Sequence, residues 1–259
     1  MFYPIDFVKI SDINNEAEII NDMGSVSYEF NISKYLITNE QFLPFLRDVK
    51  NNFFDYANFY DERCGIGWDK KELYIKDDFD NRPIAFINLE VGKAFCNYLY
   101  NLENKLDPSV ESCYKLNSNH RILNKGYFLP NLNEWHKAAF YNGKTYNDYP
   151  IADNFNPIYS YAEDGKVLNK DNDTVNFNNT YDYKNYNGFI SNVGEVGSCS
   201  QYGVYDMAGN LYDLLLDEVP YLAGGSWHSW RTSLNKRKYL KYNPNIHFGA
   251  TIGLRIVRI

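Results

Sequence analysis

The sequence predicts an α+β fold in which short strands and three helices are joined by long irregular loops. Residues 27–32 alternate polar and apolar side chains, as a half-buried strand does, and residues 39–49 space apolar side chains at helical intervals after a polar start. Residues 141–192 are rich in Asn, Asp, Tyr and Gly with almost no periodicity, which predicts long ordered loops. No internal repeat or long linker divides the chain, so we expect a single domain over residues 1–259.

The remaining elements follow from capping residues and from the C-terminal pattern. Asn88 stands where it can cap a second helix over residues 89–100, because its side chain can accept a hydrogen bond from a free backbone N–H of the first turn. A third helix is expected to begin near Asn131. Two strand-like segments, residues 223–227 and residues 252–259, are separated by a polar, basic and aromatic stretch.

Composition limits the partners and the location that we expect. The 259 residues are 44% hydrophobic and 23% charged, which is enough for a substantial core. The formal net charge of -7 would repel phosphate backbones and anionic lipid, so nucleic acid is not an expected partner. No stretch approaches the roughly 20 consecutive apolar residues that a membrane span needs. The first residues carry no secretion signal, which predicts a cytoplasmic protein.

The four cysteines indicate neither a disulfide framework nor a zinc site. They are few for this length, and they show no CxxC spacing. We therefore expect free thiols at Cys64, Cys96, Cys113 and Cys199.

Six short segments, spread over nearly the whole chain, share a pattern with one known family. In chain order they are YEFNISKYLITNEQF at residues 28–42, RPIAFINLEVGKAFC at 82–96, YFLPNLNEWHKAA at 127–139, YGVYDMAGNLYD at 202–213, GGSW at 224–227 and GLRIV at 253–257. Together they resemble the signatures of the formylglycine-generating enzyme, or sulfatase-modifying factor, family. The resemblance implies that family's variant of the C-type-lectin fold, with a small twisted antiparallel sheet, flanking helices and long loops.

The resemblance also implies structural calcium, which would hold the long loops through carboxylate, amide and backbone oxygens. One ion would lie at four residues of a single segment, Asp206, Gly209, Leu211 and Asp213. A second ion would lie at residues of two segments, Asn176, Phe177, Asn187 and Phe189. Asp213 stands where the family more often has Glu, and Asn187 replaces a usual Asp, which should weaken the second site. Loops satisfied by turns and water remain the alternative for both sites.

The family's oxidase chemistry requires two cysteines that hold copper(I), because soft thiolates suit that ion. The corresponding positions here are Ser229 and Leu234, and no cysteine lies between Ser226 and the C-terminus. We therefore expect no copper and no formylglycine-generating activity. A second branch of the family, the sulfoxide synthases, holds iron through histidines of an additional helical domain, for which this chain has no room. None of the histidines shows metal-ligand spacing, and we expect His136 at the surface or at the edge of the core.

A basic and aromatic segment follows the GGSW motif in this otherwise acidic protein. Such side chains suit anionic or peptide ligands through stacking and bidentate hydrogen bonds. The candidate ligand-binding residues are His228, Trp230, Arg231, Arg237, Tyr239 and Tyr242. A solvated loop of mixed charge is the plainer interpretation of the same residues.

Three functional hypotheses remain open from the sequence. The leading one is a non-oxidase ligand- or protein-binding domain, a pseudoenzyme whose partner is a protein, a peptide or a small polar molecule. The second is a divergent metal-dependent oxidase or modifying enzyme of the same family. The third is a retroelement-diversified or phage-type lectin-like receptor-binding protein.

Overall fold

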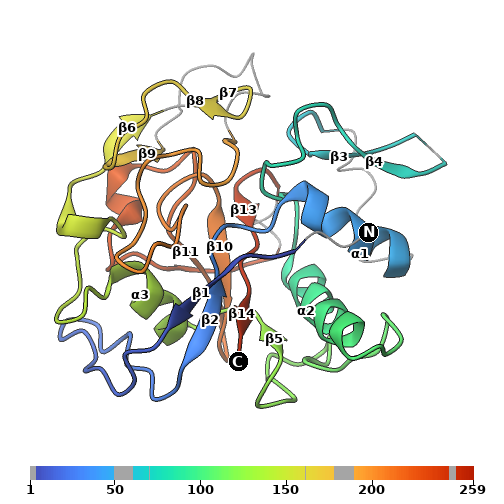
Figure 1. The fold of residues 1–259 in the computed structure, drawn as a ribbon, viewed down its shortest axis with the longest axis horizontal. Coiled ribbons are helices and arrows are strands. Elements are labelled where there is room, and N and C mark those ends of the chain that lie inside the picture. Colours follow the sequence, from blue (N-terminus) through green and yellow to red (C-terminus); the bar gives the residue numbers. More distant parts are fainter. Residues whose placement is uncertain (1–3, 50–60, 70, 161, 178–189, 245–248) are drawn as a thin grey trace.

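A computed structural model describes residues 4–49, 61–69, 71–160, 162–177, 190–244 and 249–259. Within these ranges three α-helices flank a set of small sheets (Figure 1): α1 (Asn39–Val49), α2 (Leu89–Glu103) and α3 (Leu132–Phe140). Most of the remaining chain is irregular, and the mixed architecture confirms the predicted fold class.

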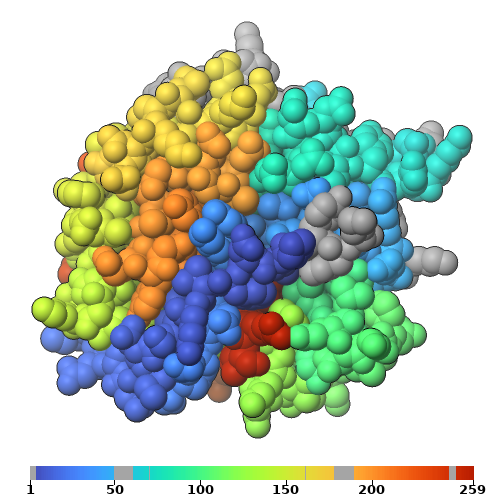
Figure 2. Space-filling model, viewed as in Figure 1, coloured from blue at the N-terminus to red at the C-terminus, as the bar shows by residue number. Residues whose placement is uncertain are grey.

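The first sheet joins the two ends of the chain. Its order is β1-β2-β14-β5 and every pairing is antiparallel. The strands are β1 (Phe7–Ile10), β2 (Phe30–Ser33), β14 (Val257–Arg258) and β5 (Tyr127–Phe128). Val257 lies opposite Ile32 on one side and Phe128 on the other, so the C-terminal strand is inserted between early and middle segments of the chain (Figure 2).

The second sheet is built from the C-terminal part alone, in the order β12-β11-β10-β13. Its strands are β12 (Leu240–Lys241), β11 (Pro220–Ala223), β10 (Tyr212–Leu216) and β13 (Ile252–Gly253). β13 is parallel to β10, and β12 forms the opposite edge. Three two-stranded pairs complete the described strands: β3 (Ile66–Trp68) with β4 (Leu73–Ile75), β6 (Ile158–Ser160) with β9 (Thr174–Asn176), and β7 (Ala162–Glu163) with β8 (Lys166–Val167).

All three predicted helices are present, and side chains cap two of them as expected. The Asn88 side chain accepts a hydrogen bond from the Val91 N–H at 2.9 Å. At α3 the Asn131 side chain accepts from the Glu134 N–H at 2.8 Å, and the Glu134 carboxylate accepts from the Asn131 N–H at 2.9 Å. This reciprocal pair is a capping box, which satisfies N–H groups that the first helical turn leaves free.

The predicted strands and loops differ from the structure in detail. The strand predicted over residues 27–32 begins only at Phe30. The segment 223–227 is a strand only up to Ala223, because Gly224 and Gly225 have positive φ angles of 84° and 75° and turn the chain. The parallel pair β6 and β9 lies in the loop-rich region and was not predicted. The side chains there do not alternate between polar and apolar, so the sequence carries no signal for a strand.

The predicted strand over residues 252–259 is two short strands that belong to different sheets. Arg255 lies between them and is fully buried. Its guanidinium donates to the Ser33 carbonyl at 2.8 Å and to the Asp213 carboxylate at 3.1 Å, so one side chain connects β2 of the first sheet with β10 of the second.

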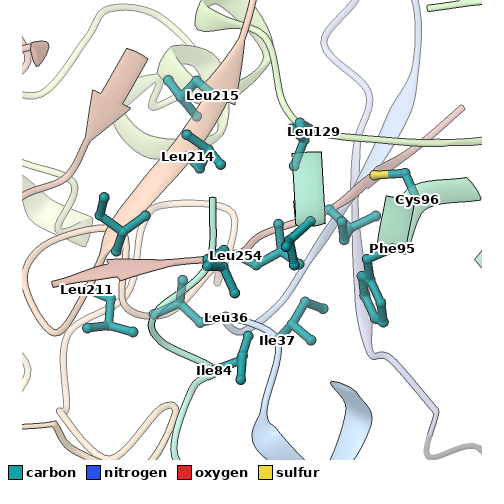
Figure 3. Packing of buried hydrophobic residues seen from close by; sticks show 14 of the residues in the cluster. Leu36, Ile37, Ile84, Phe95, Cys96, Leu129, Leu211, Leu214, Leu215 and Leu254 are labelled. Carbon is teal, nitrogen blue, oxygen red and sulfur yellow. The ribbon is translucent and has the colours of Figure 1, made fainter. Parts of the chain in front are cut away.

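One large hydrophobic core lies between the sheets and the helices (Figure 3). Leucine and isoleucine side chains from strands and loops meet there with residues of α2, among them Leu36, Ile37, Ile84, Phe95, Leu214 and Leu254. A second, smaller cluster among the described residues joins Ile151, Val175 and Phe177 of the loop-rich region with Ala208 and Leu234 from later in the chain. Among the described residues, no helix combines the length and the apolar character needed to cross a bilayer.

Candidate functional site

The two positions that correspond to copper-binding cysteines adjoin each other. A Cβ atom placed on Gly225 would lie 2.5 Å from Leu234 Cδ2 and 3.4 Å from Ser229 Oγ. Ser229 Oγ accepts a hydrogen bond from the Ser226 N–H at 2.9 Å and donates one to the Tyr212 hydroxyl at 2.9 Å. Leu234 is 1% exposed and packs in the smaller hydrophobic cluster. A hydroxyl and an alkyl group therefore occupy the two positions, and neither group is a soft ligand.

The four cysteines lie elsewhere and are not activated. Cys64 and Cys113 are buried, and burial raises the pKa of each thiol to about 11. Burial also raises the pKa of Cys96, which is fully enclosed, and of the partly buried Cys199. Because thiolates are the nucleophiles and metal ligands, these raised pKa values oppose both roles. Within the described ranges no three His, Cys, Asp or Glu side chains are grouped so that they could hold a metal ion.

Of the four histidines, the structure describes three. His136 is completely buried in α3, so the prediction that it lies at the surface or the core edge is wrong. Its Nδ1 is hydrogen-bonded to the Tyr239 hydroxyl, and its pKa is lowered to about 3 by burial and by the charge of Lys236. His120 and His228 are exposed, and His247 lies outside the described residues.

Residues 228–242, which we call the binding segment, are held to the protein by buried side chains. Lys236 is 7% exposed, and its ammonium donates to the Tyr146 carbonyl at 2.8 Å. The same ammonium pairs with Glu18 at 3.3 Å and with Asp148 at 3.4 Å. Lys236 therefore attaches the segment to an N-terminal loop and to the loop after α3.

Two of the six candidate ligand-binding residues are anchors of this kind. The Tyr239 ring packs edge-on against Trp135 with ring centroids 6.0 Å apart, and its hydroxyl contacts His136. Tyr242 is 8% exposed, and its N–H donates to the Pro220 carbonyl at 2.9 Å. Tyr242 is therefore buried, and Tyr239 is half-buried with its hydroxyl directed to His136.

The other four candidates are presented on the surface. Trp230 is 64% exposed, which is unusual for so large an apolar side chain. His228, Arg231 and Arg237 are exposed as well. The order along the segment alternates between presented residues and the anchors Ser229, Leu234, Lys236, Tyr239 and Tyr242.

Asp206, a predicted calcium ligand, is a buried carboxylate. It is 3% exposed, and its Oδ2 accepts a hydrogen bond from the Gly194 N–H at 2.7 Å. Its Oδ1 is buried and has no hydrogen-bond partner among the described residues. Burial is the largest cause that raises its pKa, to about 6. A buried carboxylate oxygen without a donor is unfavourable, and a calcium ion would compensate it.

Asp213, the other carboxylate of the predicted first calcium site, is already compensated by protein groups. Both of its oxygens accept from Arg255 Nε, at 3.2 Å and 3.1 Å, and Oδ2 also accepts from Trp135 Nε1 at 2.7 Å. The geometry therefore fits Asp206 as a metal ligand better than Asp213.

The two predicted calcium segments lie against each other. A Cβ atom on Gly209 would come within 2.3 Å of the Asn176 carbonyl oxygen, which also accepts from the Asn210 N–H at 2.8 Å. Leu211 belongs to the main core, whereas Phe177 packs in the smaller cluster with Leu234. Asn187 and Phe189 lie outside the described residues.

Sequence reasoning missed the residues that support the site. Lys236 is one of several cations in a basic segment. No local sequence signal distinguishes this buried lysine from the exposed cations around it. Tyr212 and Ser226 had no pattern that indicated their contact with Ser229. Arg255 could have been noticed, because a charged residue interrupts an apolar C-terminal strand.

The fold and the position of the Gly-Gly-Ser turn define a domain of the sulfatase-modifying class. The chain belongs to the family described as the sulfatase-modifying factor enzyme 1-like domain, whose model matches residues 15–259. No sequence match was found among curated proteins.

Solved structures share the fold at low sequence identity. Treponema denticola variable protein 1 has a TM-score of 0.61 and 16% identity, and the match covers 100% of this chain and 98% of that one. CarF has a TM-score of 0.62 and 18% identity, with 98% of each chain covered. PvdO from Pseudomonas aeruginosa has a TM-score of 0.55 and 17% identity, with 97% and 91% covered.

Proposed function

We propose that this protein is a non-oxidase binding domain that presents the binding segment to a protein, peptide or small polar ligand. The observation that carries the proposal is the alternation of buried anchors and exposed side chains along residues 228–242. A plain solvated loop has no need of a buried lysine with three oxygen partners at its centre. A loop held in one conformation loses little entropy when a ligand binds, which favours affinity.

The contents of the family's copper positions support the non-oxidase part of the proposal. Ser229 is committed to hydrogen bonds with Ser226 and Tyr212, and Leu234 to apolar packing. At these positions copper(I) would meet a hard hydroxyl oxygen and an alkyl side chain, and neither is a suitable ligand. An oxidase on this scaffold would need a different metal site.

We also propose a structural calcium ion at Asp206, beside the segment that contains Asn176. Its support is the buried Asp206 oxygen that has no donor in the described part of the chain. Because Gly209 and Asn176 adjoin, an ion there would stabilise two loops that also enclose Leu234. Calcium would then act on the binding segment through its packing and not through ligand contact.

Elemental analysis of the purified protein, together with oxygen consumption in the presence of a thiol, tests the proposal. We expect calcium, no stoichiometric copper or iron, and no oxygen consumption. The matched control is the double variant Ser229→Cys/Leu234→Cys, which should gain copper(I) because the two positions face the same point. Copper or iron at one per chain in the unaltered protein, with oxygen consumption, would make the oxidase alternative the better one.

A further inference from the structure

The C-terminal part of the chain has an extreme charge composition. Residues 219–259 contain seven Lys and Arg residues and no Asp or Glu. The preceding 218 residues therefore carry the other 19 basic groups against all 33 acidic groups, a formal charge of -14. A protein that is acidic overall thus has one uniformly basic region, and the binding segment contains five of its seven cations.

Three of the seven cations are neutralised within the protein. Arg255 pairs with Asp213, Arg258 with Glu103, and Lys236 with Glu18 and Asp148. The other four are exposed and form no ion pair with any described residue: Arg231, Arg237, Lys238 and Lys241. All four lie in the binding segment, which also contains the exposed Trp230.

The same segment supplies the edge of a sheet. β12 is the outermost strand of the order β12-β11-β10-β13. The Tyr242 N–H bonds to the Pro220 carbonyl, and Lys241 lies opposite Tyr221 as the next pair in the antiparallel register. Hydrogen-bonded and non-hydrogen-bonded pairs alternate in such a register, so the N–H and C=O of Lys241 point away from β11.

We propose that the ligand of the binding segment is an acidic polypeptide segment, which lies extended along β12 and sets its carboxylates against Arg237, Lys238 and Lys241. This inference rests on the proposed binding function and names its partner class. Main-chain hydrogen bonds to the outward N–H and C=O of Lys241 would give affinity that depends little on sequence, and the carboxylates would give selectivity. Trp230, which directly precedes Arg231 in the chain, adds an exposed aromatic side chain to the segment.

Charge favours a short acidic segment over a long polyanion. Nucleic acid or an anionic membrane would face the remaining -14 surface as well as the basic segment, and would be repelled there. A peptide that stays on the segment is screened from those charges beyond a Debye length of about 8 Å in physiological salt. A free phosphate could meet the cations but could not use the main-chain groups of β12.

A second copy of this chain does not fit the edge. Two β12 strands paired about a twofold axis would bring Lys241 and Leu240 of one copy close to the same residues of the other. Like charges across a strand pair are destabilising, and lysine on an edge strand is a common device against self-pairing. An acidic strand converts the same lysine into a favourable contact.

Fluorescence polarisation of labelled peptides on the intact protein tests this inference. The probes are a decapeptide that alternates Glu with Thr, the same peptide with Gln for Glu, and the Glu peptide N-methylated at alternate residues. The variant is Arg237→Gln/Lys238→Gln/Lys241→Gln. Its control, Lys71→Gln/Lys115→Gln/Lys125→Gln, removes three exposed cations from other loops and changes the net charge equally.

We expect the Glu peptide to bind, and the Gln and N-methylated peptides to bind about tenfold or more weakly. The binding-segment variant should lose about as much affinity, whereas the control variant should keep it. Equal loss in both variants would mean a bulk charge effect and would overturn the inference. Stronger binding of inorganic polyphosphate or of phosphatidylserine vesicles would overturn it as well.

The test separates this inference from the proposed binding function. A neutral peptide that binds and depends on Trp230, but not on the three cations, would contradict the acidic partner and leave the binding function standing. Circular dichroism of each variant confirms the fold, and all substituted cations are exposed.

Discussion

The main core and the loops around the binding segment are stabilised in different ways. The main core is formed by side chains whose spacing follows helical or strand periodicity, as in α2, where Val91, Phe95 and Leu99 are all buried. The smaller cluster has five buried members among the described residues, and its loops depend on individual polar contacts such as those of Lys236. The main core should therefore tolerate the loss of one contact, because many other contacts remain. A loop that is held by a single contact should lose its conformation when that contact is removed.

Arg255 is the point where the two regions meet. It bonds to Ser33 in the first sheet, to Asp213 in the second, and to the Tyr205 carbonyl in the loop that leads to Asp206. We therefore expect that replacing a buried polar side chain at such a junction lowers the stability of the protein more than replacing a polar side chain at the surface.

The largest effect is expected for Asp213→Ala. It leaves the buried Arg255 without its counter-charge and the Trp135 N–H without an acceptor, which should lower the free energy of unfolding by about 3–5 kcal/mol. Urea denaturation followed by circular dichroism, with a calcium chelator present in all samples, measures the change. Glu218→Ala, an exposed carboxylate after β10, should change stability by less than about 0.5 kcal/mol. A loss below about 1 kcal/mol for Asp213→Ala would show that the ion pair does not join the sheets.

A pH effect is expected from His136. Its folded pKa of about 3 lies below the ordinary value of 6.5, so between these pH values the unfolded chain binds more protons. Stability should therefore be fully present above pH 6.5 and fall as the pH is lowered, by roughly 3 kcal/mol near pH 4 at 1.36 kcal/mol per pKa unit. His136→Phe should flatten this part of the profile.

The exposed His120 is the matched control for that profile. His120→Gln should keep the slope of the unaltered protein. The same slope in His136→Phe would assign the acid sensitivity to carboxylates and not to the buried imidazole.

Calcium removal should have an effect of similar or smaller size. If the ion binds at Asp206, saturating calcium at a hundredfold over its Kd would stabilise the protein by about 2.7 kcal/mol, or roughly 5–10 °C in Tm at this chain length. Differential scanning calorimetry with calcium and with chelator measures the difference. Asp206→Asn should abolish it, and Asp173→Asn, in a loop outside the predicted ligands, should not. An unchanged Tm on chelation would mean that protein contacts alone stabilise these loops and that no calcium ion is needed.

The smallest effect on stability is expected for Trp230→Ala, because this side chain is 64% exposed. The change in unfolding free energy should stay within about 0.5 kcal/mol. Ligand binding, measured with the labelled Glu peptide, should fall severalfold, since exposed aromatic residues often dominate interface energies. Trp227→Ala is the contrasting variant: Trp227 is 7% exposed and donates to the Ala250 carbonyl, so its loss should destabilise the fold.

Much of the architecture could be predicted from local pattern. Helices α1, α2 and α3 begin where polar capping residues precede periodic apolar residues, and Asn88 and Asn131 perform the capping that their position indicates. The strands were predicted less well. Strands of two to five residues leave too few alternations to read, and residues 252–259 form strands of two sheets because Arg255 turns inward between them.

The candidate site was only partly predictable. The lack of cysteine at positions 229 and 234 and the basic character of the segment are properties of the sequence alone. The sequence alone does not show which residues of the segment face solvent. Tyr239 and Trp230 are both aromatic, but Tyr239 packs against Trp135 whereas Trp230 is exposed.

By itself, then, the sequence determined the family, the fold class, where the three helices begin and the concentration of positive charge near the C-terminus. These depend on residue identity and on neighbours close in the chain. Only the tertiary structure decided that Lys236 is buried against Glu18, that Asp206 keeps an oxygen without a donor among the described residues, and that β12 is the outermost described strand of its sheet. These features depend on groups that are far apart in the chain, and no local pattern records which of them will meet.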